Sequence, residues 1–137
     1  MSTAAAIYIG AYTIQMLIAR VEGDSEPEII NEFTAYTRIG ENLDKSNLLT
    51  ADGMALAEKA FKEMHEAAQY HKVEKFCIVA SGSLRNAVNR ASLFVLCNNE
   101  FGSFPQLLSN KDEARLHFAG TVTKDFAALP IIVAYIG

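Results

Sequence analysis

Residues 5–20 read AAIYIGAYTIQMLIAR, and this stretch decides the fold. The apolar run that ends at Gly10 predicts a buried strand over Ala4 to Ile9. The run that follows, Thr13 to Val21, contains β-branched side chains and predicts a second strand. A third strand is expected at Glu28 to Tyr36. Because the connections between these strands are short, the three strands are expected to form an antiparallel meander.

Helices and strands are expected to alternate after the meander. Thr50 is a suitable N-cap for a helix that runs to Tyr70, because apolar side chains recur at helical spacing between them. Further strands are expected at Phe76–Ala80, Pro105–Leu108 and Pro130–Gly137, with helices at Leu84–Cys97 and Lys111–Ala119. The resulting order, βββαβαβ followed by a helix and the start of another strand, predicts an α/β fold. In such a fold a mixed sheet carries helices on its faces.

Composition narrows the class of protein. The chain has 137 residues, enough for one compact domain, and a net charge of −4, which disfavours a nucleic-acid surface. No apolar run is long enough to cross a membrane. Cys77 and Cys97 lie in apolar stretches without metal-ligand spacing, so both are expected to be buried thiols in a cytoplasmic protein. His65, His71 and His117 also lack such spacing and are expected to be ordinary helix or surface residues.

A short repeat links the two ends of the chain. The sequence Ile7-Tyr8-Ile9-Gly10 is echoed by Ala134-Tyr135-Ile136-Gly137. A strand-plus-glycine signature that recurs at about the length of a domain suggests a duplication. We therefore expect residues 1–130 to form one domain and residues 131–137 to begin a second, related one.

Four segments in the same order resemble one family. AAIYIGAYTIQMLIAR (5–20) resembles the motif AAIDIGSNSxRLLxA, and TRIGENLD (37–44) is similar to TRLGEGLD. VASGSLRNA (79–87) resembles VATSALREA, and LSNKDEARL (108–116) resembles ISGxEEARL. These are motifs of the exopolyphosphatase and guanosine-pentaphosphatase (Ppx/GppA) phosphatases, and the resemblance covers nearly the whole chain.

The resemblance implies a fold, a reaction and a partner. The fold would be that of actin-like ATPase and ribonuclease H-like domains, in which two related α/β domains enclose a cleft. The reaction would be Mg²⁺-assisted release of the terminal phosphate from polyphosphate or guanosine pentaphosphate. The partner would be the second domain of the same chain.

The resemblance also assigns roles to individual residues. Glu113 matches the catalytic glutamate, which can act as a general base, and Arg85 matches an arginine that can clamp phosphate oxygens. Gly10 and Thr13 would form a phosphate-binding turn, with Arg38 as a further phosphate ligand. Without the resemblance, Glu113 is an ordinary acidic residue at the start of a helix, and both arginines are solvated charges.

Two tyrosines stand where the resemblance has aspartates. Tyr8 replaces the acidic residue of the first motif, and Tyr135 replaces that of the second. A phenol, with an ordinary pKa of about 10, is neutral at pH 7 and is a poor ligand for Mg²⁺. The sequence therefore predicts no metal ligands at these positions and weak or absent hydrolysis. A non-catalytic paralogue that binds a phosphorylated ligand or a partner, and a homodimer formed through an exposed face, remain as alternatives. Both tyrosines are also compatible with ordinary packing in strands.

Overall fold

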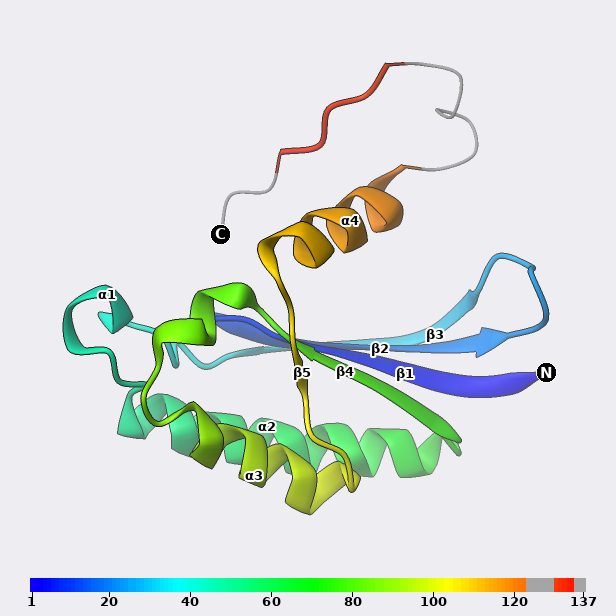
Figure 1. The fold of residues 1–137 in the computed structure, drawn as a ribbon. Helices are drawn as coiled ribbons and strands as arrows, with labels where there is room; N and C mark the ends of the chain where they lie inside the picture. The colour runs from blue at the N-terminus through cyan, green and yellow to red at the C-terminus, as the bar shows by residue number, and fades with distance from the viewer. Residues whose placement is uncertain (123–129, 135–137) are drawn as a thin grey trace.

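The computed structural model describes residues 1–122 and 130–134. Its elements in chain order are β1 (Ser2–Ile9), β2 (Thr13–Val21), β3 (Glu28–Tyr36), α1 (Leu43–Ser46), α2 (Ala51–Tyr70), β4 (Lys75–Ala80), the 3₁₀-helix η1 (Gly82–Asn86), α3 (Arg90–Phe101), β5 (Gln106–Leu107) and α4 (Asn110–Thr121). Figure 1 shows one sheet with α2 and α3 on one face and α4 on the other. In the part of the chain described, no helix is both long and apolar enough to span a membrane.

The sheet is mixed, as expected. Its strand order is β3-β2-β1-β4-β5, with antiparallel pairs between β1, β2 and β3 and parallel pairs from β1 to β4 and from β4 to β5. The short β1–β2 turn allows antiparallel pairing, whereas the parallel β1–β4 pair is reached through α2. Ile9 is paired with both Ile14 and Ala80. The ends of β1 and β4 and the β1–β2 turn therefore meet at one edge of the sheet.

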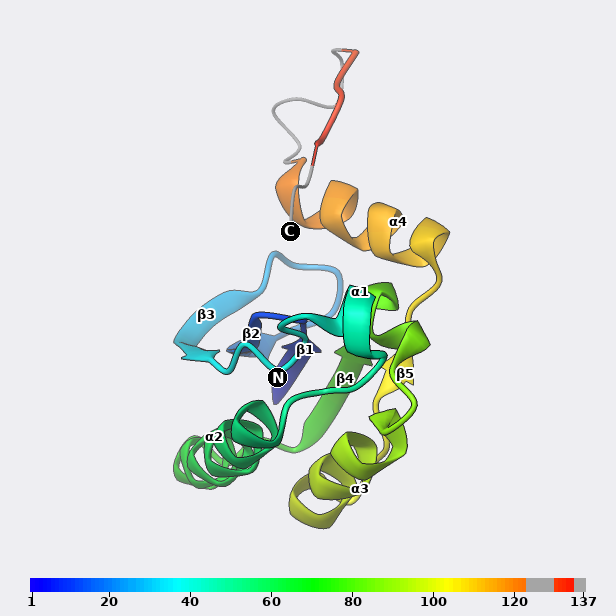
Figure 2. The ribbon, with the colours of Figure 1, turned by 90° about the vertical axis from the view of Figure 1, so that its left-hand side faces the viewer.

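The hydrophobic core lies between the sheet and the two helices α2 and α3 (Figures 1 and 2). Alternate residues of β1, including Ile7 and Ile9, point into it, and Phe61 and Met64 of α2 are completely buried. Thr50 caps α2 as predicted, since its side chain accepts a hydrogen bond from the Gly53 amide at 3.1 Å. Burial of this apolar surface supplies most of the driving force for folding.

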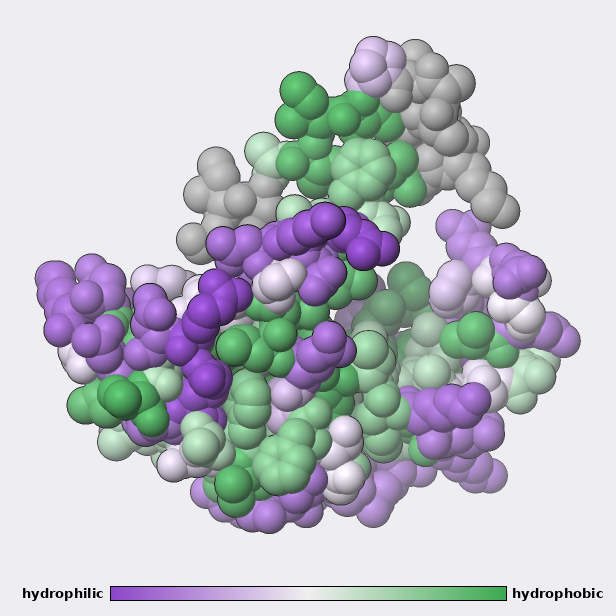
Figure 3. All heavy atoms as spheres, viewed as in Figure 1, coloured by the Kyte–Doolittle hydropathy of each residue, from purple (hydrophilic) through white to green (hydrophobic). Residues whose placement is uncertain are grey.

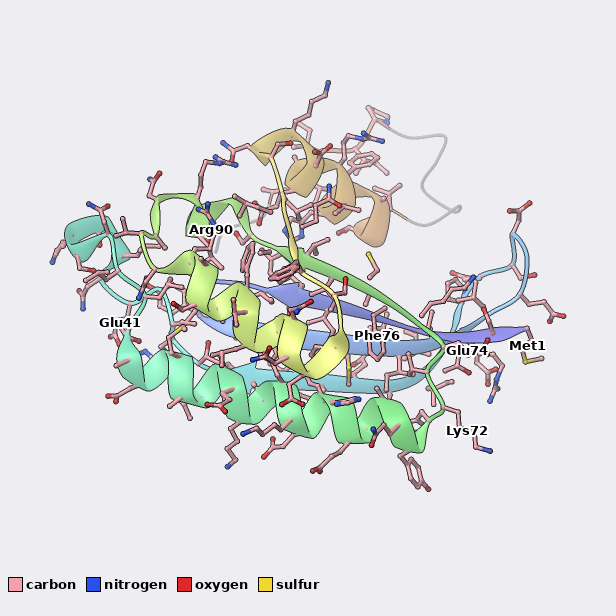
Figure 4. All side chains as sticks on the ribbon, turned by 60° about the horizontal axis from the view of Figure 1, so that its bottom comes forward. Met1, Glu41, Lys72, Glu74, Phe76 and Arg90 are labelled. Carbon is pink, nitrogen blue, oxygen red and sulfur yellow. The ribbon has the colours of Figure 1, made fainter. Side chains whose placement is uncertain are left out.

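Aromatic side chains extend this core along β4 and α3. Phe76 of β4 points toward α3 (Figure 4), and its ring centroid lies 5.2 Å from that of Phe101. Phe61 of α2 meets the same ring of Phe101 edge to face at 6.0 Å. Strand β4 and helices α2 and α3 are therefore joined at this point by a single aromatic cluster.

The opposite face of the sheet is less covered. Helix α4 crosses it without burying any residue completely, and Leu116 remains 53% exposed. Figure 3 shows that residues 130–134 form a hydrophobic surface above α4, where Ile132 is almost fully exposed. Cys77 is also exposed, so its predicted burial is wrong. Side chains alternate along β4, and Ile78 points into the core, so Cys77 points to the opposite face. Cys97 is buried as expected, and burial raises the pKa of its thiol to about 12.

Two predicted elements differ from the structure. The helix expected at Leu84–Cys97 is wrong in extent, because η1 and α3 are separate and Ala87 between them is extended. Asn89 holds this break by donating to the Leu49 carbonyl at 3.0 Å and accepting from the Leu49 amide at 2.8 Å. Arg90 lies at the junction (Figure 4) and donates to the carbonyls of Leu84 and Arg85. The strand expected at Pro130–Gly137 is absent from residues 130–134, and residues 135–137 lie outside the described residues.

Two glycines, one in the loop before α1 and one in the first turn of α2, are packed without room for an additional side-chain atom. A Cβ at Gly40 would lie 2.7 Å from the Cβ of Ala11, and one at Gly53 would lie 2.5 Å from the Cα of Ile39. Contacts under 3.0 Å cannot be tolerated, so the loop or the helix would have to move. These glycines therefore set how closely the 37–44 segment approaches the β1–β2 turn and α2.

The contact at Gly53 leads to a stability prediction. Gly53→Ala is expected to lower the free energy of unfolding by about 2 kcal/mol, because the gain in helix propensity is smaller than the cost of overpacking against Ile39. Gly120→Ala is the matched control, since a Cβ there meets nothing within 4 Å, and it is expected to be neutral or slightly stabilising. Urea unfolding measures both changes. Equal effects of the two substitutions would contradict the packing described here.

Candidate functional site

The candidate site is a cavity at the edge where β1 and β4 end. Its volume is about 570 Å³, and it is lined by Tyr8, the β1–β2 turn, residues 81–83 and the first turn of α4. The backbone holds these segments in place: the Ser81 amide donates to the Ile9 carbonyl at 2.9 Å, and the Leu108 amide donates to the Ala80 carbonyl at 2.9 Å. The parallel pairing of the sheet thus continues into the loops that form the cavity.

Glu113 is the charged group of this cavity. It lies in the first turn of α4, whose N-cap Ser109 accepts a hydrogen bond from the Asp112 amide at 3.1 Å. Tyr8 and Ser81 both donate hydroxyl hydrogen bonds to Oε1 of Glu113, at 2.7 Å and 2.8 Å. The Gly82 amide donates to Oε2 at 3.1 Å. Three donors from β1 and from the segment after β4 therefore hold one carboxylate.

These donors control the ionisation of Glu113. Partial burial by itself raises the pKa of the carboxyl group, since it disfavours the charged form. The hydrogen bonds from Tyr8, Ser81 and Gly82, together with the charge of His117, outweigh this effect and bring the pKa below its ordinary value of 4.5. Glu113 is therefore an ionised acceptor at neutral pH.

The β1–β2 turn lines the same cavity, and its carbonyl groups are bonded to the 37–40 segment. The carbonyl of Ala11 accepts from the Gly40 amide at 2.8 Å, and the carbonyl of Tyr12 accepts from the amides of Thr37 and Arg38 at 3.0 Å. In a trans peptide the N–H points opposite to the carbonyl, and the chain has no cis peptide bond in its described residues. The N–H groups of the two following residues, Tyr12 and Thr13, therefore point away from the 37–40 segment.

The structure brings together only part of the set of residues predicted for the site. Gly10, Thr13 and Glu113 all line the cavity. Arg85 does not line it, because its guanidinium donates to the Leu108 carbonyl at 3.0 Å and supports the loop before α4. Arg38 is 66% exposed and pairs with Glu41 at 2.8 Å, also outside the cavity. Phosphate-binding roles for these two arginines remain predictions.

The sequence reasoning did not identify three residues that build the site. Ser81 and Gly82 contact Glu113 directly, and His117 stands edge-on to the Tyr8 ring, with centroids 6.0 Å apart, so its assignment as an ordinary helix residue missed this contact. A serine directly after a buried strand is the signal that could have pointed to Ser81. His117 follows Glu113 by one helical turn, a spacing that places both side chains on one face of α4.

The acidic and imidazole side chains do not form a metal centre by themselves. Among residues 1–122 and 130–134, no group of three His, Cys, Asp or Glu side chains is placed to hold an ion. Tyr8 stands at the strand end where the family motif has aspartate, and Glu113 already accepts three hydrogen bonds. The donor set of the described residues therefore does not fit Mg²⁺, which prefers carboxylate and water oxygens.

The fold and the cavity at its strand ends define a domain of the actin-like ATPase class, as expected. Solved structures support this class. An exopolyphosphatase-like protein matches with a TM-score of 0.82 and 25% identity, over 90% of this chain and 38% of that protein. A Ppx/GppA family member from Aquifex aeolicus matches with a TM-score of 0.78 and 24% identity, over 87% of this chain and 39% of that one.

The chain belongs to the Ppx/GppA phosphatase family, whose model matches residues 17–137. Exopolyphosphatase 2 of Mycobacterium tuberculosis is 28% identical over 142 residues, which cover 97% of this chain and 44% of that protein. The chain thus spans less than half the length of the curated relatives it matches. The family and the fold implied by the four motifs are confirmed.

The hydrogen bond from Tyr8 leads to a pH-dependent stability prediction. Because the folded-state pKa of Glu113 is lowered, its ionised form stabilises the fold above the ordinary pKa, and this contribution is lost as the pH falls through the folded-state value. Tyr8→Phe is expected to cost about 1 kcal/mol at neutral pH, a small value because the carboxylate is partly solvated. The cost is expected to shrink at acid pH.

Urea unfolding at neutral pH and well below pH 4.5 measures this difference. Tyr36→Phe is the control, because Tyr36 is 77% exposed on β3 and should show no pH-dependent effect. A loss in Tyr8→Phe that is the same at both pH values would show that the ionised carboxylate is not the acceptor that matters.

Proposed function

We propose that this chain forms one wall of a cleft that binds the terminal phosphate of polyphosphate or guanosine pentaphosphate and hydrolyses it weakly or not at all. The observation that carries the proposal is the position of Glu113, which lines one cavity together with the β1–β2 turn while Tyr8 donates to it. Curated relatives are named exopolyphosphatases. In this proposal a second, related domain supplies the other wall.

The β1–β2 turn supports the phosphate-binding half of the proposal. The N–H groups of Tyr12 and Thr13 point away from the 37–40 segment, and the Thr13 side chain lies beside the same cavity. Consecutive backbone amides that face one side form a concavity suited to anionic oxygens. Gly10 is needed there, because a Cβ would come within 3.0 Å of the Thr13 carbonyl oxygen.

The ionisation of Glu113 supports weak turnover. A general base works best when its pKa lies near the working pH, and hydrogen bonds hold the pKa of Glu113 below 4.5. Accepting hydrogen bonds from Tyr8 and Ser81 also occupies Oε1, one of the two oxygens that could take a proton from water. Phosphoryl transfer depends mainly on positioning and charge stabilisation, and Tyr8 supplies no charge.

The same hydrogen bonds favour a second candidate function, that of a phosphate- or nucleotide-binding paralogue without turnover. A carboxylate held by three donors is poorly placed to accept a proton from water. The two candidates differ in one observable. Glu113→Gln abolishes phosphate release in a slow enzyme and changes only binding in a non-catalytic protein.

The decisive substitution restores the family's acidic residues. In the full-length protein, Tyr8→Asp combined with Tyr135→Asp is expected to raise Mg²⁺-dependent phosphate release from polyphosphate by about a hundredfold, because charge stabilisation at a phosphoryl group is worth at least this much. Residues 1–137 alone are expected to release none. Phosphate release is followed by colorimetry, with guanosine pentaphosphate as a parallel substrate to distinguish the two ligands.

Matched controls separate chemistry from surface charge. Tyr70→Asp adds an exposed carboxylate on α2, and Glu63→Gln removes an exposed one from the same helix; neither is expected to change the rate. If the unaltered full-length protein already turns over as fast as the restored variant, and Glu113→Gln stops it, the proposal of weak turnover is wrong.

A further inference from the structure

The hydrogen bond between Tyr8 and Glu113 has a consequence for the metal requirement of this site. We propose that the Tyr8 hydroxyl takes the place of a divalent cation beside Glu113, so that the site holds its carboxylate and accepts phosphate without Mg²⁺. The statement about phosphate rests on the proposed function, whereas the statement about the cation rests only on the geometry around Glu113.

The acceptor positions of Glu113 are largely filled. An ionised carboxylate offers about four lone-pair positions. The hydroxyls of Tyr8 and Ser81 occupy Oε1, and the Gly82 amide takes one position on Oε2. Mg²⁺ binds oxygen at about 2.1 Å in a near-octahedral shell, so an ion on Oε1 would displace two donors whose hydrogens point at that oxygen. Such donors repel a cation.

The charge balance at the strand end gives an independent reason. Two carboxylates at hydrogen-bonding distance repel one another, and a cation between them relieves this repulsion. A tyrosine at position 8 leaves a single negative charge and provides a donor at 2.7 Å. The repulsion that a divalent ion would neutralise is therefore absent, and the need for the ion disappears together with the second carboxylate.

Neighbouring groups on several sides fix the position of the Tyr8 ring. Its edge faces His117 with 6.0 Å between centroids and 71° between planes. A Cβ on Gly10 would come 3.2 Å from Cε1 of Tyr8, so the glycine leaves space for the ring. Tyr8 is also paired through the backbone with Gln15 and Val79 on the two neighbouring strands. These contacts hold the Tyr8 hydroxyl within hydrogen-bonding distance of Glu113.

Manganese binding tests directly whether Tyr8 takes the place of a cation beside Glu113. The full-length protein is titrated with Mn²⁺, and free ion is followed by electron paramagnetic resonance. The panel is the unaltered protein, Tyr8→Phe, Tyr8→Asp, Glu113→Gln and Tyr8→Asp with Glu113→Gln. We expect no saturable binding that depends on Glu113 in the first two. We expect Tyr8→Asp to gain a site at least about tenfold tighter, which the added Glu113→Gln removes.

Two outcomes of the titration would overturn the proposal. If the unaltered protein binds Mn²⁺ in a saturable manner and Glu113→Gln abolishes that binding, Tyr8 does not replace the ion. Failure of Tyr8→Asp to gain a site, in a protein shown by circular dichroism to be folded, would remove Tyr8 as the cause. Tyr8→Phe retains the ring and loses only the hydroxyl donor. It therefore distinguishes a hydroxyl that blocks the ion from the absence of a second carboxylate.

Phosphate binding is tested separately. Calorimetric titration of the unaltered protein with inorganic tripolyphosphate in EDTA is expected to show binding, which Glu63→Gln leaves unchanged. Binding only when Mg²⁺ is present would overturn the proposal and leave the proposed function standing. Absence of binding with and without Mg²⁺ would overturn the proposed function, and the manganese titration would still decide the role of Tyr8.

Discussion

The pairing of β1 with a strand on each side is the constraint on which the rest of the domain depends. Antiparallel pairing to β2 brings a short turn to the end of β1, and parallel pairing to β4 brings the end of a second strand to the same edge. A parallel pair needs a long connection, and α2 fills this connection while covering the core face. The β1–β2 turn, the segment after β4 and the first turn of α4 meet at this place, although they come from distant parts of the chain.

At that place the domain arranges donors around a single negative charge. The Tyr8 hydroxyl comes from the end of β1, and the Ser81 hydroxyl and the Gly82 amide come from the segment that follows β4. Such segments are rigid because the sheet anchors them, and their polar groups need not reorganise when a ligand arrives. The same rigidity restricts the chemistry, because a carboxylate that is well held as an acceptor is a poor base.

The sequence predicted those elements that depend on residues close together in the chain. The meander and α2 follow from periodicity, and the motif around Glu113 follows from family resemblance. The break between η1 and α3 was not foreseeable, because it depends on Asn89 bonding to Leu49, 40 residues away. The partners of Glu113 were missed for the same reason: Tyr8 is 105 residues distant in the chain. Cys77 was misjudged because an apolar run does not reveal which face of a sheet another element covers.

The contact between Ala11 and Gly40 links two segments that the chain separates by β2 and β3. The methyl group of Ala11 occupies the volume that a side chain at position 40 would need, since the two Cβ positions would be 2.7 Å apart. The two positions consequently share one small volume. Across homologous sequences they should covary in size, with a larger residue accepted at one of them only where the other is minimal.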